Sequence, residues 1–310
     1  MLTFDWPLIG HTSAVQFLQT ALRNNTLQHS YLFCGPEGVG KTTLANFFVR
    51  SLLCQNRASA GKVPCTTCSA CRMLEKRIHP DVIWVQRGQD ERVLSIDAVR
   101  ALLDRISTTS FLRSYKVALI SEADHLTLEA ANALLKMLEE PPANTVFILT
   151  AESSTLLPAT ILSRVQAIPL RVLPAAILQR ALESEGIPHE AARTLAGASY
   201  GRPGRMRQLL NKEVAAQWHE GIMQARVFVS ASAGARLAMI PKLLKDYGEE
   251  LALTMLTVAG REALLHNVKN GDKEVSQRFL ALCKGLHEVP FIIGRNTPAR
   301  AAFEYASCIL

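Results

Sequence analysis

The sequence has few aromatic residues, no long apolar run and no export signal. Aromatics make up 6% of the 310 residues, while the abundant alanine and leucine favour helices. The longest apolar stretch, around residues 251–259, is about half the roughly 18 residues that a membrane helix needs. The first six residues lack the basic and apolar regions of a signal peptide. We therefore expect a cytoplasmic protein with no membrane partner.

The charge imbalance is also small. The chain holds 34 basic and 27 acidic side chains, a net charge of +7. This bias permits contact with a nucleic-acid backbone but does not demonstrate it. Hydrophobic residues are 48% of the total, which excludes a largely disordered chain. A globular protein of two or three domains is expected from this length.

Cysteine is scarce along the chain but concentrated in one segment. Four of the seven cysteines follow the pattern Cys54-x₁₀-Cys65-x₂-Cys68-x₂-Cys71. Four thiolates satisfy tetrahedral Zn²⁺ and leave no open position, so the pattern predicts a structural zinc site. A redox pair, buried cysteines or an iron–sulfur cluster are the alternatives. We interpret the nearby His79 as a structural residue, because four cysteines already complete the shell.

Apolar runs that alternate with helical patterns indicate the fold class. Strands are expected at residues 29–34, 81–85, 116–121, 145–150 and 165–170. Helices are expected at 13–27, 41–53, 96–106 and 128–140. This order predicts an α/β domain with a mostly parallel sheet. Three short helices should follow at 175–185, 190–196 and 204–211, and longer helices, with breaks near 230–234, 248 and 271, should complete the chain.

A phosphate-binding loop follows the first expected strand. The stretch Gly35-Pro-Glu-Gly-Val-Gly-Lys41-Thr42 matches G-x-x-x-x-G-K-[ST]. Glycines let backbone N–H groups curl around phosphate oxygens, the lysine supplies a positive charge, and the threonine hydroxyl can bind Mg²⁺. An incidental glycine turn is the alternative. The candidate nucleotide-binding residues, for ATP or ADP with Mg²⁺, are Gly35, Gly38, Gly40, Lys41, Thr42 and Thr43.

An acidic residue expected for ATP hydrolysis is missing. A phosphate-loop ATPase uses an Asp at a strand end to hold Mg²⁺, usually followed by a Glu that polarises water. After the strand at 116–120 this chain has Ser121 in the first position and Glu122 in the second. Asp124 lies further along and is interpreted as a loop or helix-start residue. Hydrolysis should be weak or absent, while nucleotide binding could survive.

Together these residues resemble a known family, the bacterial clamp-loader subunits of the AAA+ class, which include the gamma/tau motor and its delta-prime partner. The resemblance is close over about the first 210 residues and is carried by the phosphate loop, the four cysteines and four further stretches. These are Leu8-Ile-Gly-His11, Ala130-Ala-Asn-Ala-Leu-Leu-Lys-Met-Leu-Glu-Glu-Pro-Pro142, Thr145-Val-Phe-Ile-Leu-Thr150 and Leu157-Pro-Ala-Thr-Ile-Leu-Ser-Arg164. The family's motor carries Asp where this chain has Ser121 and usually continues well beyond the third domain. The chain therefore resembles the delta-prime stator more closely.

The resemblance implies a domain layout and a set of partners. Residues 1–172 would form the AAA+ phosphate-loop domain, with a zinc module at about 54–77. Residues 173–212 would form a three-helix lid, and 213–310 a helical collar for oligomerisation. The chain would act in the DNA polymerase III holoenzyme with gamma/tau and delta subunits, in a hetero-pentamer that places the sliding clamp on primed DNA. Its own ATPase activity would be weak or absent.

The resemblance also assigns roles to single residues. In the family, an arginine of a Ser-Arg-Cys motif completes the ATP site of the neighbouring motor. This chain has Ser163-Arg164-Val165, so Arg164 would be that trans arginine finger, and a surface arginine at a helix end is the alternative. Thr150 matches a position that senses the γ-phosphate, and a strand-end cap is its alternative. Arg205 or Arg202 would be the phosphate-sensing arginine of the lid, and the alternative is that neither occupies that position.

Two other functions are compatible with the same motifs. The chain could be an ATP-hydrolysing gamma/tau-like motor in which Glu122 and Asp124 suffice for Mg²⁺. It could also be an autonomous DNA-binding or repair protein, which the modest net charge argues against. Any DNA contact should be to the backbone, because basic and aromatic residues do not interleave. Basic residues around the cysteines could contact DNA phosphates or the clamp, and a solvated surface is the alternative: Arg50, Arg57, Lys62, Arg72, Lys76 and Arg77.

Overall fold

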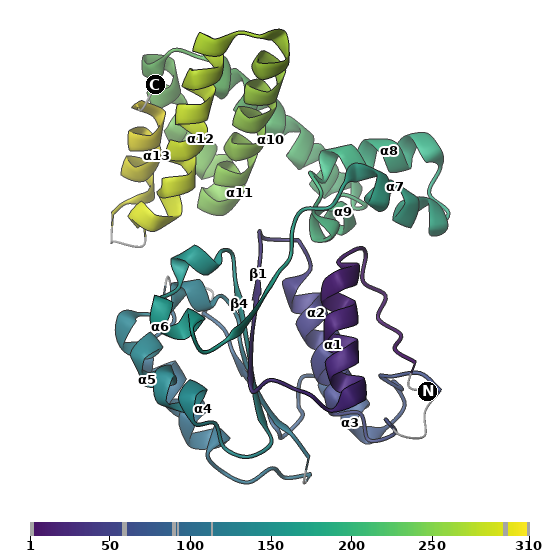
Figure 1. Ribbon diagram of the computed structural model, residues 1–310. Helices are drawn as coiled ribbons and strands as arrows, with labels where there is room; N and C mark the ends of the chain where they lie inside the picture. Colours follow the sequence, from purple (N-terminus) through teal and green to yellow (C-terminus); the bar gives the residue numbers. More distant parts are fainter. Residues whose placement is uncertain are drawn as a thin grey trace. The chain divides into compact units, whose positions relative to one another are not determined.

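The computed structural model describes residues 3–57, 61–88, 91, 93–112, 114–293 and 297–308. The chain divides into two compact units, Met1–Met206 and Arg207–Leu310 (Figure 1). The first unit contains the sheet and nearly all of the three helices that follow it, and the second is made of helices. Each unit is described by itself.

A five-stranded sheet forms the centre of the first unit. Its strands pair in the order β2-β3-β4-β1-β5, and every pairing is parallel. The strands are β1 (Ser30–Cys34), β2 (Val82–Val85), β3 (Lys116–Ile120), β4 (Thr145–Ala151) and β5 (Gln166–Pro169). All five lie within the expected ranges or extend them by one residue, and the predicted parallel sheet is confirmed. Strand β1 lies between β4 and β5, so the loop that follows it leaves from the interior of the sheet.

Helices cover both faces of this sheet (Figure 1). One apolar layer packs α1 and α2 onto the sheet through residues such as Leu18, Leu22 and Phe48. The other layer packs α4, α5 and α6 through residues such as Leu102 and Leu134. The helices of this unit before the lid are α1 (Thr12–Asn24), α2 (Lys41–Leu52), α3 (Ser69–Glu75), α4 (Ile96–Ile106), α5 (Leu128–Glu139) and α6 (Ala159–Leu162). Because helices cover both faces, the residues of β1, β3 and β4 are buried along their whole length, whereas β5 at the edge of the sheet is mostly exposed.

The ends of these helices follow from capping residues. The Ser95 and Thr127 side chains accept hydrogen bonds from the backbone N–H groups of Ala98 and Ala130, so they cap α4 and α5. Helix α1 ends three residues before the expected position 27, because Asn25 adopts a left-handed conformation (φ 54°). Helix α3, inside the cysteine segment, was not expected from the sequence.

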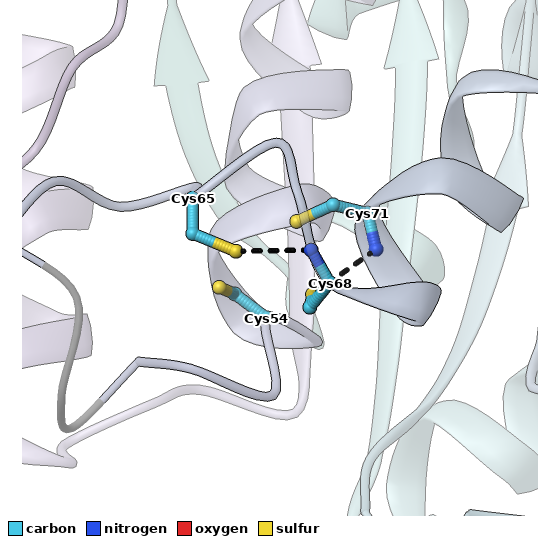
Figure 2. A group of neighbouring side chains, drawn as sticks. All are labelled: Cys54, Cys65, Cys68 and Cys71. Carbon is cyan, nitrogen blue, oxygen red and sulfur yellow. Dashed lines mark hydrogen bonds between the residues drawn. The ribbon is translucent and has the colours of Figure 1, made fainter.

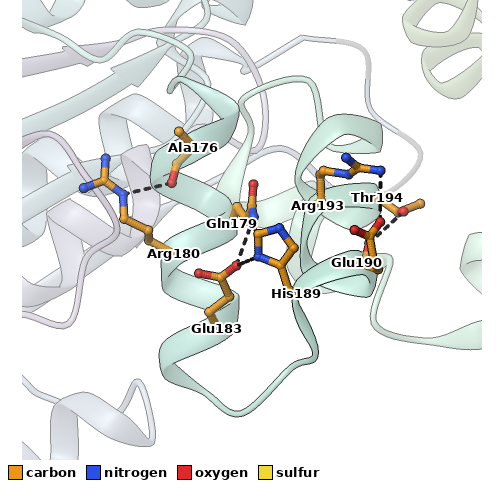
Figure 3. Close-up of polar contacts among 8 residues, drawn as sticks. All are labelled: Ala176, Gln179, Arg180, Glu183, His189, Glu190, Arg193 and Thr194. Carbon is orange, nitrogen blue, oxygen red and sulfur yellow. Dashed lines mark hydrogen bonds and ion pairs between the residues drawn. The ribbon is translucent and has the colours of Figure 1, made fainter.

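Three short helices follow the sheet: α7 (Ala175–Ser184), α8 (His189–Ala198) and α9 (Pro203–Gln208), whose last two residues belong to the second unit. They enclose a small apolar cluster that includes Leu178, Leu182 and Met206. Polar groups join α7 to the start of α8, as Figure 3 shows: the Glu183 carboxylate accepts hydrogen bonds from Gln179 (2.9 Å) and from His189 (2.7 Å). We call these three helices the lid.

The second unit consists of α10 (Lys212–Ser230), α11 (Ala233–Asn270), α12 (Lys273–Ile293) and α13 (Ala299–Cys308). Arg236 is 7% exposed and donates to the carbonyls of Phe228 (3.1 Å) and Val229 (2.9 Å), which closes the C-terminal end of α10. Gly248, with φ 71° and ψ 174°, interrupts α11 at an expected break. Among the described residues, no helix is long and apolar enough to cross a membrane.

Candidate functional site

The phosphate loop connects β1 to α2, where the sequence placed it. Strand β1 ends at Cys34, and α2 begins at Lys41. A Cβ atom at Gly35 would lie 2.1 Å from the carbonyl oxygen of Leu170, so no other residue fits there without a shift of backbone. Gly38 has a φ of 71°, a conformation that favours glycine. The glycines are therefore required by the local backbone itself.

Lys41 is turned onto its own loop. Its Nζ donates hydrogen bonds to the carbonyls of Gly35 (2.5 Å) and Pro36 (3.2 Å). Burial lowers the pKa of the Lys41 ammonium, and the nearby carboxylates of Glu152 and Asp124 oppose this shift. A phosphate would have to draw Lys41 away from these carbonyls. Thr42 and Thr43, the other two polar candidates of the loop, are exposed at the start of α2.

The end of β3 presents Ser121 and Glu122 near this loop. The Glu122 side chain forms an ion pair with Arg87, whose Nε donates to a carboxylate oxygen at 2.6 Å. The Glu122 backbone N–H donates to the Thr150 hydroxyl at 3.1 Å, and Thr150 is only 3% exposed. The carboxylate that the sequence proposed as a base is thus engaged with a cation, and the proposed sensor contacts the backbone beside it. Arg87 was not anticipated.

A second pair of acids lies beside the loop. A carboxylate oxygen of Asp124 accepts a hydrogen bond from the Glu152 backbone N–H at 2.9 Å, which joins the short helix after β3 to the end of β4. Loss of hydration raises the pKa of the Glu152 carboxyl, and the Lys41 ammonium opposes that shift. Glu152 is a further residue that sequence reasoning missed, although its position directly after a parallel strand was a usable signal.

The lid contacts the phosphate loop directly. The Gly204 backbone N–H donates to the Gly38 carbonyl at 2.8 Å. A Cβ atom at Gly204 would lie 3.0 Å from the Gly38 backbone, so two glycines meet with no side chain between them. Arg205 lies next to this contact and is 8% exposed, while Arg202 lies one turn earlier. Both sensor candidates therefore belong to the segment that reaches the loop.

The four clustered cysteines converge on one point. Cys54 follows the end of α2, Cys65 and Cys68 precede α3, and Cys71 lies in the first turn of α3. Their sulfur atoms all lie within 4.8 Å of one another, and Figure 2 shows the side chains turned toward a common centre. A tetrahedral zinc site with Zn–S bonds of about 2.3 Å needs sulfurs about 3.8 Å apart. The donor set and its spacing fit such an ion.

Backbone groups already orient these thiols. The N–H of Cys68 donates to the Cys65 sulfur, and the N–H of Cys71 donates to the Cys68 sulfur, both at 3.4 Å. Although burial opposes it, hydrogen bonds from Cys68 and Thr67 lower the pKa of the Cys65 thiol to about 6. Burial raises the pKa of the Cys54 and Cys71 thiols. Negative charge at one sulfur is thus favoured before any cation binds.

Arg164 lies directly after α6 and before β5. Its Nε donates to a Glu139 carboxylate oxygen at 2.8 Å, and its Nη1 donates to the Thr160 carbonyl (2.8 Å) and the Ser163 hydroxyl (2.9 Å). The side chain is 31% exposed. These partners belong to α5 and α6 and the residues beside them, so Arg164 occupies a part of the sheet's rim other than the phosphate loop. Glu139 was not singled out from the sequence.

Comparisons with known proteins agree on a family. The sequence profile described as "DNA polymerase III, delta subunit" matches residues 10–174. DNA polymerase III subunit delta' of Pseudomonas aeruginosa is 39% identical over 63% of this chain and 60% of that protein. The delta' subunit of Bacillus subtilis is 31% identical over 85% of this chain and 80% of that protein. The tau subunit of Escherichia coli is 31% identical over 83% of this chain, but over 41% of its own length.

Among solved structures, a gamma subunit-related protein of Thermotoga maritima is similar to this chain with a TM-score of 0.49 and 18% identity, over 94% of this chain and 97% of that one. The family assignment rests on the sequence matches. The chain belongs to the DNA polymerase III delta-subunit family, as a clamp-loader subunit of the delta-prime type.

Proposed function

We propose that this chain is the stator of a hetero-pentameric AAA+ clamp loader, in which it contributes Arg164 to the ATP site of a neighbouring gamma/tau subunit. With gamma/tau and delta subunits it would help to open the sliding clamp and place it on primed DNA, touching only the DNA backbone. Clamp loading is part of chromosome replication, so we place the protein in the cytoplasm. The observation that carries the proposal is Ser121 at the end of β3, where a motor needs an aspartate.

The arrangement around that serine supports weak hydrolysis at the chain's own loop. Glu122 is paired with Arg87, and Lys41 is bonded to the loop carbonyls. The loop can still hold ATP or ADP, because its glycines and its lysine are in place. Thr150 and Arg205 would then serve as structural contacts near the nucleotide rather than as sensors of hydrolysis.

The remaining parts have supporting roles. We propose that Cys54, Cys65, Cys68 and Cys71 bind one structural Zn²⁺ that fixes the segment at about 54–77. Residues 1–172 would form the AAA+ domain, 173–212 the lid and 213–310 an oligomerisation collar. The basic residues beside the cysteines are partly engaged within the chain, since Arg77 stacks over Trp84 and Lys62 pairs with Asp5. Because of these contacts within the chain, the basic residues give little support for a DNA-binding surface.

The test is the ATPase activity of the reconstituted loader on primed DNA with the clamp. An arginine finger contributes about 10³–10⁵ in rate at the site it serves. Arg164→Ala should therefore remove hydrolysis at the neighbouring site, while Lys41→Ala should leave total hydrolysis nearly unchanged. Arg171→Ala, an exposed arginine after β5, is the matched control.

A gamma/tau-like motor is the second candidate, favoured by the intact loop and the acids Glu122 and Asp124. Under that alternative, Lys41→Ala would abolish hydrolysis at this subunit and Arg164→Ala would not affect it. Steady ATP hydrolysis by the purified chain alone would support the motor as well. Either result would contradict the stator function.

A further inference from the structure

The guanidinium of Arg164 is held on several sides by its own chain. Nε and Nη2 both contact the Glu139 carboxylate, and Nη1 contacts Thr160 and Ser163. The Ser163 hydroxyl donates to the Thr160 carbonyl at 3.1 Å, so its lone pairs are free to accept from the arginine. These contacts occupy all three nitrogens. A bidentate contact with a phosphate needs two N–H groups on one edge of the fork, so the arginine must give up some of them.

The backbone of Arg164 is fixed independently of its side chain. Its carbonyl accepts a hydrogen bond of 2.6 Å from the hydroxyl of Ser30, which is 1% exposed at the start of β1. Its N–H donates to the Ile161 carbonyl at 2.9 Å. The Cα position is therefore set by β1, an interior strand of the sheet, whereas the guanidinium is partly exposed. The side chain can change partners while its anchor stays in place.

Glu139 occupies a position that local electrostatics disfavour. It is the last residue of α5, and the C-terminal end of a helix carries partial negative charge that repels a carboxylate. The Arg164 cation offsets this repulsion. Both side chains are partly exposed, at 49% for Glu139 and 31% for Arg164, and such ion pairs are weak in water. A triphosphate brings more negative charge than one carboxylate, so it can displace Glu139.

We propose that Glu139 is a positioning residue that holds Arg164 within its own subunit until the γ-phosphate of a neighbouring nucleotide replaces it. This inference rests on the proposed function, because it requires Arg164 to act in trans. Before assembly, the carboxylate neutralises the arginine and keeps it from other anions. In the assembled loader, part of the free energy of ATP binding at the interface is used to break the ion pair between Glu139 and Arg164. Glu139 thus affects the KM for ATP at the neighbouring site, whereas Arg164 affects the rate of the chemical step.

The test varies ATP in the reconstituted loader and separates kcat from KM. Glu139→Gln keeps the size and an acceptor oxygen but removes the charge. It should lower the KM for ATP severalfold, by about fivefold at most for an exposed ion pair, with kcat unchanged. Glu139→Asp, which keeps the charge, should return KM toward the wild-type value. Glu140→Gln, at the exposed neighbouring residue, is the matched control and should behave as wild type.

Two outcomes would overturn the inference. A Glu139→Gln loader with reduced kcat and unchanged KM would mean that the carboxylate holds the arginine in its active position. A loader with both parameters unchanged would mean that the ion pair has no part in ATP engagement. Thermal denaturation of the variant chain verifies that folding is intact. If Arg164→Ala itself leaves hydrolysis unchanged, the proposed function fails first, and that result is distinct from both.

Discussion

The phosphate loop lies at one end of helix α2 and the cysteine cluster at the other. The two sites differ in how far their side chains are already arranged to bind a ligand. At the C-terminal end, Cys54 joins three other thiols whose sulfurs already lie within 4.8 Å of one another. At the N-terminal end, Lys41 is bonded to its own loop and Glu122 is paired with Arg87. The cysteine cluster is arranged for its ligand, whereas the phosphate loop must exchange internal contacts for a nucleotide.

A metal and a nucleotide would therefore couple to the stability of the fold in different ways. A metal that completes a preformed cluster adds its binding free energy to the stability of the segment that carries the ligands. A nucleotide at the loop would first displace Lys41 from two carbonyls, and part of its binding free energy would be spent there. The chain should therefore depend strongly on metal and only weakly on nucleotide for its stability.

Loss of the metal should destabilise the chain most. Cys71→Ser, or treatment of the full chain with a strong chelator, should unfold the segment around residues 54–77. Structural zinc sites in small domains bind with apparent free energies of about 10–16 kcal/mol at neutral pH, and this segment buries few other apolar groups. Thermal denaturation with metal analysis measures the effect. Cys308→Ser, at an exposed cysteine, is the control. A metal-free chain that melts at the wild-type temperature would refute the zinc assignment.

An intermediate effect is expected where the lid meets the phosphate loop. Gly204→Ala places a Cβ atom 3.0 Å from the Gly38 backbone, and such overpacking typically costs about 1–3 kcal/mol. Gly197→Ala in α8 meets nothing within 4 Å and should stabilise the helix by about 0.5–1 kcal/mol. Urea denaturation followed by circular dichroism compares the two variants. Shifts of the same sign would show that the glycine contact does not constrain the lid.

The smallest effect is expected inside the lid. Hydrogen bonds from Gln179 and then from His189 lower the pKa of the Glu183 carboxyl. A carboxyl with a lowered folded-state pKa stabilises the fold above its unfolded pKa, here near 4.5, and loses that contribution as pH falls through the folded value. Glu183→Gln should slightly lower the melting temperature at pH 7 and not at pH 3. Glu190→Gln, which removes an exposed carboxylate paired with Arg193 on the same helix (2.9 Å), is the control for a surface ion pair. An equal loss at both pH values would assign the effect to packing.

The secondary structure was predictable where local signals agreed. Helix α4 spans the expected residues because Ser95 caps it and its apolar residues repeat with helical spacing. Helix α1 is shorter than expected, because the left-handed turn at Asn25 overrides the apolar pattern that continues to Leu27. Helix α3 was missed because it has seven residues, too few to show a period.

The candidate sites also differ in how much of each could be predicted from local sequence. The cysteine cluster was predictable because three of its members, Cys65, Cys68 and Cys71, are close in sequence and the fourth, Cys54, follows a helix end. By contrast, the partners Arg87 and Glu139 approach Glu122 and Arg164 only through the order of the strands and the packing of α5 on α6. Spacing along the chain carries no information on such pairings, so the tertiary structure was needed to find them.

The interruption of α11 at Gly248 has a mechanical consequence. A straight helix of 38 residues would span about 57 Å and would pass a twist applied at one end to the other. At Gly248 the backbone leaves the helical conformation, with φ 71° and ψ 174°, and a Cβ atom there would meet nothing within 4 Å. Helix α11 is therefore two shorter helical segments joined at Gly248. The two segments therefore need not share one helix axis.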